Sequence, residues 1–180
     1  MRDLRAAGVP FVPQPCGQDG PDHEVVEYVA GDCPHYPLPP WVWADESLRQ
    51  VGAALRVLHD ALDTGVVCHG DVSPDNTVWR DGVLVAFIDW DEAVIAPRGH
   101  DLGYAAYRFV SLTPPGHPDG LDQPVAEQRR RLRVLCAAYG DADPADVVRW
   151  AVTRVEALAA SASPHRDLYA GDAEWLRSLL

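Results

Sequence analysis

A β-hairpin predicted directly after a polar loop is the feature that most constrains the fold of this chain. Residues 77–80 and 83–88 are β-prone runs, and Asp81-Gly82 lies between them. Asp-Gly between two apolar runs is a strong hairpin signal, because the turn requires positive φ at its central residues. Since a two-stranded ribbon folds back on itself, Asp89 after the second strand should return to the level of Asn76 before the first.

The loop before the hairpin, residues 68–76, has the form C-H-G-D-x-x-x-x-N. Asp71 and Asn76 are five residues apart, so one loop can direct both side chains into one cleft together with Asp89. Carboxylate and amide oxygens are suitable ligands for Mg²⁺. Phosphoryl transfer from Mg·ATP needs such ligands and a carboxylate that orients and deprotonates the acceptor hydroxyl. Each residue alone is an ordinary turn or cap residue; together, at this spacing, they indicate phosphoryl transfer.

Residues 69–76 and 88–91 resemble the catalytic loop and the metal-binding segment of the aminoglycoside phosphotransferase / choline kinase-like (phosphotransferase enzyme) family. Its members are small-molecule relatives of the protein kinases. Protein kinases have Arg at the position of Gly70, where glycine is the small-molecule kinase form. Residues 96–106 continue the resemblance with a turn and an Asp-Leu pair that opens a helix. The resemblance covers roughly residues 4–112 and implies an α+β, protein kinase-like fold.

The resemblance implies a role for each matching residue. Asp71 would be the catalytic base, and Asn76 and Asp89 would bind Mg²⁺. The ATP-binding residues would be Glu27, Tyr28 and Val29, through their backbone at the adenine edge, and Val78 and Ile88, at the floor of the adenine pocket. Asp101 would cap its helix and brace the catalytic loop. Asp91 is ambiguous: it could contact a second metal or the substrate, but a solvated turn acid is the simpler expectation.

The same resemblance divides the chain into two parts. Residues 1–31 would be a remnant of the N-lobe and hinge, and within them residues 25–31 resemble the hinge strand that carries adenine. Residues 32–180 would form the helical C-lobe, with the catalytic loop at 68–76 and the metal-binding hairpin at 77–91. The fold would thus be mainly the C-lobe, with a reduced N-terminal β portion.

Parts of the kinase machinery have no counterpart in this sequence. Kinase-like folds hold the ATP phosphates with a Gly-rich loop and a strand Lys, but this chain contains no Lys and no G-x-G-x-x-G before the hinge. Three interpretations stay open. The chain is a shortened form of a longer enzyme, or an Arg such as Arg2 or Arg5 replaces the Lys, or the chain is a relative that has lost turnover.

Apolar periodicity predicts the helices of the body. Asp45 looks like an N-cap, and Pro144 suits the first position of a later helix. The apolar stripes are Leu48, Val51, Leu55, Leu58 and Leu62, then Leu132, Leu135, Cys136 and Tyr139, then Val148, Val152, Val155 and Ala159. A helix over 101–112 should end at the Pro-rich run 114–118, and residues 175–180 should form a short closing helix.

In this family the helical body would supply the acceptor site. The candidates are Tyr104, Tyr107, Arg108, Trp150 and Glu156. For each of them, a place in the core or on a solvated face is the simpler expectation. The run 129–131 of three arginines should be an exposed helix face.

Composition limits the partners and the compartment. The net charge of −12 argues against nucleic acid, whose binding rests on Lys and Arg, and is compatible with a cationic small-molecule acceptor such as an aminoglycoside or amino alcohol. Hydrophobic content of 47% argues for a folded chain, and no run of about 18 apolar residues suggests a membrane span. The four Cys form no C-x-x-C, and the amino terminus lacks a secretory h-region, so a reduced, cytoplasmic protein is expected.

Two other functions are compatible with the sequence. The chain could be a catalytically degenerate, kinase-like binding or dimerisation module, and a homodimer could complete its reduced N-lobe. It could instead be a metal-dependent phosphohydrolase of the HD type, because it has the dipeptides His59-Asp60 and His100-Asp101 together with His23 and His69. That chemistry needs imidazoles that converge from several helices, whereas His23, His69 and His100 lie on predicted loops.

Overall fold

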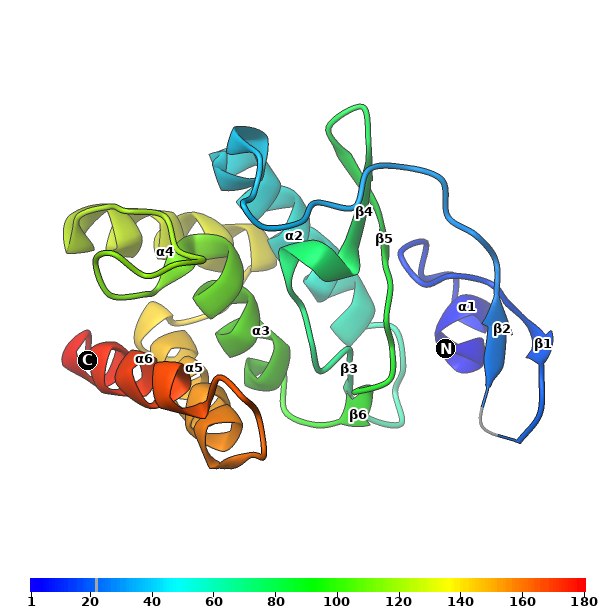
Figure 1. Ribbon diagram of the computed structural model, residues 1–180. Helices are drawn as coiled ribbons and strands as arrows, with labels where there is room; N and C mark the ends of the chain where they lie inside the picture. The colour runs from blue at the N-terminus through cyan, green and yellow to red at the C-terminus, as the bar shows by residue number, and fades with distance from the viewer. Residues whose placement is uncertain (22) are drawn as a thin grey trace.

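The computed structural model describes residues 1–21 and 23–180. The amino-terminal elements are α1 (Arg2–Ala6), β1 (Pro15–Gln18) and β2 (Glu24–Val26). The two strands pair antiparallel, and the Glu27 N–H donates to the Gln14 carbonyl at 2.9 Å, which continues the pairing beyond the strands. These elements occupy one end of the molecule, and the carboxyl-terminal helices occupy the other (Figure 1).

The helical body forms most of the rest of the chain. Its helices are α2 (Asp45–His59), α3 (Gly99–Ala105), α4 (Val125–Tyr139), α5 (Pro144–Ala160) and α6 (Arg166–Ser178). A 3₁₀ helix, Pro40–Trp43, precedes α2, and a π-helical turn, Ala106–Ser111, continues α3. Helix α2 packs against α4, and α5 packs against both α3 and α6 (Figure 1).

The predicted hairpin is confirmed. Strand β4 (Thr77–Arg80) pairs antiparallel with β5 (Val83–Phe87), and the turn residues Asp81 and Gly82 have φ of 51° and 77°. The connector from the amino-terminal sheet joins the hairpin, since Asp32 and Trp79 exchange backbone hydrogen bonds of 2.7 and 2.8 Å. The hairpin therefore lies between the amino-terminal sheet and the helical body.

The predicted apolar stripe of α2 forms part of the core. Leu48, Val51, Leu55 and Leu58 are at most 1% exposed, as a three- and four-residue repeat requires. Burial of each such side chain contributes about 1.5–3 kcal/mol. Leu62 lies beyond the end of the helix at His59 and is only partly buried.

The expected N-cap at Asp45 is wrong. Ala44 occupies the cap position, and Asp45 is the first helical residue. The two carboxylate oxygens of Asp45 instead accept hydrogen bonds of 2.7 Å each from Arg130 on α4. These bonds lower the pKa of Asp45. The acid thus joins two helices, and local capping preferences could not indicate that.

Three further expectations need correction. The closing helix is longer than residues 175–180, because α6 already begins at Arg166. Asp101 is the third residue of α3 and makes no cap hydrogen bond. Arg131 is not on an exposed face; it is 3% exposed and donates to the carbonyls of Trp43 and Phe109, which the ends of neighbouring helical segments leave available.

A short ladder precedes the polar loop. Strand β3 (Val67–Cys68) pairs antiparallel with β6 (Val94–Ile95), which places the loop start beside the segment after the hairpin. Cys68 is fully buried, as predicted, and all four cysteines are free thiols. Among the helices that the structure describes, none has the length and apolarity needed to cross a membrane.

Candidate active site

The loop of residues 68–76 is anchored by one buried carboxylate. Asp101 on α3 accepts hydrogen bonds of 2.8 Å from the backbone N–H groups of both His69 and Gly70. It also lies 3.0 Å from Nε2 of His59, at the end of α2. Burial would raise the pKa of Asp101, but the hydrogen bonds from His59 and from the two N–H groups lower it overall. The predicted bracing role of Asp101 is confirmed.

His59 connects this carboxylate to α4. Its Nδ1 lies 3.0 Å from the Tyr139 hydroxyl, which also accepts a 3.0 Å hydrogen bond from Arg98. Since Tyr139 accepts from Arg98, its hydroxyl proton is directed at His59 Nδ1, and His59 Nε2–H donates to Asp101. The loop is thereby tied to α2, α3 and α4 at once.

Gly70 occupies a position that only glycine fits. Its φ is 88°, and an added Cβ would overlap the Glu92 carbonyl oxygen. Its own carbonyl accepts a 3.0 Å hydrogen bond from Nη2 of Arg154 on α5. The peptide before Asp71 is therefore held on both sides, by the Glu92 backbone just before β6 and by Arg154 on α5.

His69 connects the loop to the segment after the hairpin. Its Nδ1 accepts from the Asp71 N–H at 3.2 Å, so its proton is on Nε2, which donates to the Ile88 carbonyl at 2.9 Å. Burial lowers the pKa of His69, which keeps the ring neutral in this bridging role.

Asp71, Asn76 and Asp89 are brought together as the spacing predicted. Asn76 Nδ2 donates to the Asp71 carboxylate at 2.7 Å and to the Asp71 carbonyl at 3.0 Å. The Asn76 carbonyl accepts from the Ile88 N–H at 2.9 Å, which places Asp89 next to it. Asp89 has φ of 61°, and its side chain is exposed. A non-glycine residue held at positive φ is strained and is commonly found at functional sites.

The donor set suits a hard divalent cation. Because Asn76 Nδ2 is used by Asp71, its Oδ1 faces away from that bond and is available to a metal. The exposed carboxylate of Asp89 is the second oxygen donor. Amide and carboxylate oxygens are the ligands that Mg²⁺ takes in nucleotide sites.

A family model described as the phosphotransferase enzyme family matches residues 28–147, about two thirds of the chain. The chain belongs to the phosphotransferase enzyme family. The matched region contains the whole 68–76 loop, the hairpin and Asp101.

The trifolitoxin immunity protein of Rhizobium leguminosarum bv. trifolii is 31% identical over 165 residues, which cover 78% of this chain and 61% of that relative. This phosphotransferase-family chain thus spans about three fifths of the length of the curated relative. A choline/ethanolamine kinase family protein from Mesorhizobium loti is 15% identical with a TM-score of 0.66, covering 99% of this chain and 76% of that chain. The ADP-bound aminoglycoside phosphotransferase APH(2'')-Ib is 12% identical with a TM-score of 0.60, covering 98% and 78%. These likenesses show the kinase-like fold.

Two of the five residues expected to hold the nucleotide, Glu27 and Ile88, line one cavity of about 240 Å³. Asp89 also lines it, together with Met1, Pro13, Glu24, Val26, Trp90 and Asp91. Tyr28, Val29 and Val78 do not line it; Val78 is buried in β4, and the Tyr28 side chain projects into solvent with 89% exposure. The proposed role of residues 27–29 concerns their backbone, which an exposed side chain does not affect.

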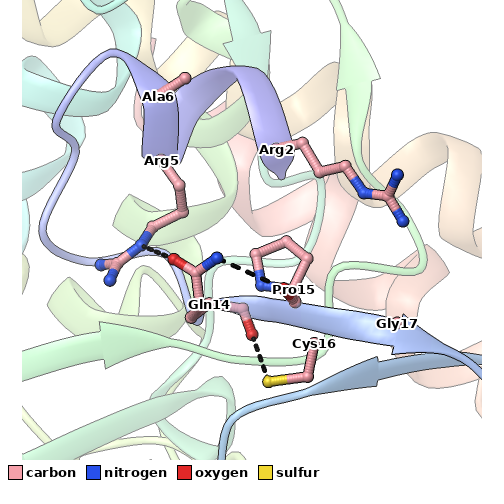
Figure 2. Close-up of a pocket in the computed structure, with 7 residues that line it drawn as sticks. All are labelled: Arg2, Arg5, Ala6, Gln14, Pro15, Cys16 and Gly17. Atoms are coloured by element: carbon pink, nitrogen blue, oxygen red, sulfur yellow. Dashed lines mark hydrogen bonds between the residues drawn. The ribbon is translucent and has the colours of Figure 1, made fainter.

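Arg2 and Arg5, the candidates to replace the kinase Lys, do not line the Asp89 cavity. Both line a separate pocket of about 500 Å³ with Gln14, Cys16 and neighbouring residues (Figure 2). Arg5 Nε donates to Gln14 Oε1 at 3.3 Å, and Arg5 approaches Glu27 to 3.9 Å. Arg2 approaches Glu24 to 3.9 Å.

The acceptor-site candidates separate into two groups. Tyr107 donates a 2.6 Å hydrogen bond to the buried Asp172, Trp150 packs on Gly99 and Gly103, and Glu156 pairs with Arg177 at the surface. Tyr104 and Arg108 are different. Burial raises the pKa of Tyr104, and Arg108 and Asp71 are both near enough to shift that pKa further.

The two His-Asp dipeptides do meet, but not as a hydrolase site needs. His59, Cys68 and Asp101 have ligand atoms within 4.8 Å of one another, all buried. Their polar atoms are already used in the hydrogen bonds that anchor the loop. Asp60 turns outward to Arg56 and Arg98. The family assignment and this geometry both argue against an HD-type hydrolase.

Sequence analysis missed Arg154 and Tyr139 as supports of the loop. Arg154 stands between the buried stripe residues of α5, and nothing in the local pattern distinguishes it from a solvated arginine. Tyr139 was assigned to the apolar stripe of α4, where a terminal hydroxyl directed at His59 could not be foreseen.

Proposed function

We propose that this chain binds Mg·ATP and transfers the γ-phosphate to a hydroxyl of a small molecule. The observation that supports this best is the hydrogen-bond network in which Asn76 contacts both Asp71 and the backbone before Asp89. This network holds the proposed base Asp71 beside Asn76 and ties the backbone before Asp89 to the same residue. Such preorganisation is the main contribution that a protein makes to phosphoryl transfer.

Asp71 would act on the acceptor. Its carboxylate, held by Asn76 Nδ2, orients the hydroxyl and takes its proton. The acceptor oxygen forms the new bond to the γ-phosphorus, the bond to the β,γ-bridging oxygen breaks, and ADP leaves with that electron pair. The bracing of His69 and Gly70 by Asp101 prevents the loop from moving while charge develops.

Asn76 and Asp89 would hold Mg²⁺, which offsets the negative charge of the phosphates when bound. The nucleotide would lie along the cavity lined by Glu27, Ile88 and Asp89. The ADP-bound state of the structurally similar aminoglycoside phosphotransferase supports a nucleotide at this fold.

The acceptor is proposed to be a small molecule. A net charge of −12 taken alone favours a cationic acceptor, such as an aminoglycoside or an amino alcohol. Arg154 donates to the Gly70 carbonyl beside Asp71, and Arg108 is within electrostatic range of Asp75 on the same loop; both favour the opposite charge.

A kinase-like binding module without turnover is the second candidate. It is favoured by the absence of Lys from the sequence and by the position of Arg2 and Arg5 outside the Asp89 cavity. The similarity to an immunity protein suggests protection from a toxin as a cellular role for either candidate.

The deciding experiment is calorimetric titration of the protein with ATP, with and without Mg²⁺. Asp89→Ala tests the metal ligand, and Asp63→Ala, an exposed turn acid that does not line the cavity, is the matched control. We expect Mg²⁺-dependent binding that Asp63→Ala retains and Asp89→Ala loses. Binding by the wild type that is unaffected by Asp89→Ala would remove Asp89 from the site. No binding by folded protein would reject the phosphotransferase and favour the second candidate.

A further inference from the structure

Two arginines near the 68–76 loop have no acidic partner among the residues that the structure describes. Arg108 and Arg154 form no ion pair with any residue in the described ranges 1–21 and 23–180, although the chain has 27 acidic residues. Arg80, Arg129 and Arg133 also lack an ion pair within those ranges, but they are exposed to water. Arg108 and Arg154 are the partly buried ones, and this makes their lack of a partner informative.

Arg108 is held between aromatic rings. Its guanidinium carbon is 4.9 Å from the ring centre of Tyr36 and 5.7 Å from that of Tyr107. Its Nε is buried and has no hydrogen-bond partner. Contact with the rings offsets only part of the cost of removing this cation from water without a counter-ion. The position is therefore poorly compensated within the protein alone.

Arg154 has a similar environment and lies directly on the loop. Its Nη2 donates to the Gly70 carbonyl, one residue before Asp71, and its guanidinium carbon is 5.3 Å from the ring centre of Tyr104. Its Nε is also buried without a hydrogen-bond partner.

Tyr104 lies against Arg154 and next to the tyrosine on which Arg108 lies. Its ring centre is 6.1 Å from that of Tyr107, on which Arg108 lies. Arg108, Asp71 and Arg154 are all close enough to shift the pKa of the Tyr104 phenol. Asp75, on the same loop, has a buried Oδ1 without a partner and is within electrostatic range of Arg108, yet forms no ion pair with it.

We propose that Arg108 and Arg154 bind an anionic group of the acceptor, a carboxylate or a phosphate, while Asp71 faces its hydroxyl. This inference rests on the proposed function and specifies its substrate class. A guanidinium offers several donors in a planar fork that matches a carboxylate or phosphate, so a bound anion would compensate both partly buried charges. The acceptor is then a hydroxy acid or a phosphorylated hydroxyl compound rather than an amino alcohol or aminoglycoside.

The test uses four probes that share a hydroxyl. Glycerate carries a carboxylate, glycerol 3-phosphate carries a phosphate, glycerol is neutral and choline is cationic. Each is titrated calorimetrically into the full chain without nucleotide. We expect glycerate or glycerol 3-phosphate to bind more tightly than glycerol and choline, and the better of the two identifies the anion. Equal or weaker binding of both anionic probes would overturn the proposal.

Variants locate the binding. Arg108→Met keeps the aliphatic stem between the tyrosines and should weaken anion binding by about 10- to 100-fold. Arg154→Met should act in the same direction and serves if Arg108→Met does not fold. Arg133→Met removes the same charge from an exposed position on α4 and should change nothing. Anion binding that survives both Arg108→Met and Arg154→Met would overturn the proposal.

Nucleotide binding separates this inference from the proposed function. Arg108→Met should keep its affinity for Mg·ATP, and Asp89→Ala should keep its affinity for the anion. If the wild type binds the anion through Arg108 but does not bind Mg·ATP, the anion site is supported and the phosphotransferase is rejected. If it binds Mg·ATP but neither anion, the phosphotransferase is supported and the anionic acceptor is rejected.

Discussion

Asp101 on α3 and His59 at the end of α2 form a fully buried pair, with 3.0 Å between Oδ2 and Nε2. The same carboxylate accepts the N–H groups of His69 and Gly70. One side chain thus fixes the relation of two helices to the loop that carries Asp71. Because both of its carboxylate oxygens accept hydrogen bonds, loss of its charge should affect both stability and function.

Asp101→Asn should lower the free energy of unfolding by about 2–4 kcal/mol, because an amide NH₂ would face backbone donors and leave one of them unsatisfied. Chemical denaturation measures this. Asp63→Asn, at an exposed turn position, is the control and should stay within about 0.5 kcal/mol of the wild type. An equal effect of the two substitutions would contradict the bracing role.

Gly70→Ala should destabilise the protein more than Gly82→Ala. Both glycines have positive φ, 88° and 77°, so both substitutions carry the same backbone strain of about 1 kcal/mol. At Gly82 a Cβ meets no atom within 4 Å, whereas at Gly70 it overlaps the Glu92 carbonyl. The difference between the losses of unfolding free energy in Gly70→Ala and Gly82→Ala measures the cost of the steric overlap with Glu92. Similar values would mean that the Glu92 segment moves away freely.

Asp71→Asn should lower turnover by about 10²–10⁴-fold, since an amide cannot accept the hydroxyl proton. Affinity for Mg·ATP should change little, because Asn76 Oδ1 and Asp89 keep their places. Steady-state kinetics with the acceptor found by the anion titrations, combined with calorimetry, measures both quantities. Wild-type turnover in this variant would exclude Asp71 as the base.

Stability should fall as the pH is lowered below about 6.5, the ordinary pKa of histidine. Burial lowers the pKa of His69 in the folded state, so the unfolded chain binds more protons in the window between the folded value and 6.5. His69 Nδ1 now accepts a hydrogen bond from the Asp71 N–H. Protonation of Nδ1 would replace this acceptor with a second N–H, and the hydrogen bond would be lost. Denaturation at pH 7.5 and 5.5 should show the loss.

The pH effect has its own controls. His69→Gln should show a smaller decrease in stability between the two pH values than the wild type. His165→Gln, at an exposed position, should show the same decrease as the wild type. If the pH dependence of His69→Gln equals that of the wild type, the neutral bridge between the loop and Ile88 is not its source.

Much of the fold follows from local sequence. Asp81-Gly82 demanded a tight turn, and the hairpin formed with its strands within one residue of the expected bounds. The apolar repeat of α2 placed four leucine and valine side chains in the core. The prediction of an N-cap at Asp45 was wrong because a distant residue competes with the local preference. The Asp45 carboxylate accepts hydrogen bonds from Arg130 on α4 and does not cap α2.

The candidate site was predictable to the same extent. Asp71, Asn76 and Asp89 were identified because one loop and one hairpin bring them together, which spacing along the chain reveals. Arg154 and His59 reach the loop from helices that are distant in sequence, so no spacing pattern pointed to them. Their side chains matter because of where the helices pack.

The sequence by itself determined the phosphotransferase-type loop, the hairpin and the three oxygen-bearing side chains, since these depend on turn geometry and short-range spacing. Only the tertiary structure decided how that loop is held and what faces it. Packing of α3 and α5 brings Asp101 to two backbone N–H groups and Arg154 to the Gly70 carbonyl, and it leaves Arg108 and Arg154 without an ion pair among the described residues. The physical reason is burial. A charged side chain loses solvation free energy only after packing removes it from water, and it then needs a partner, which the sequence alone does not reveal.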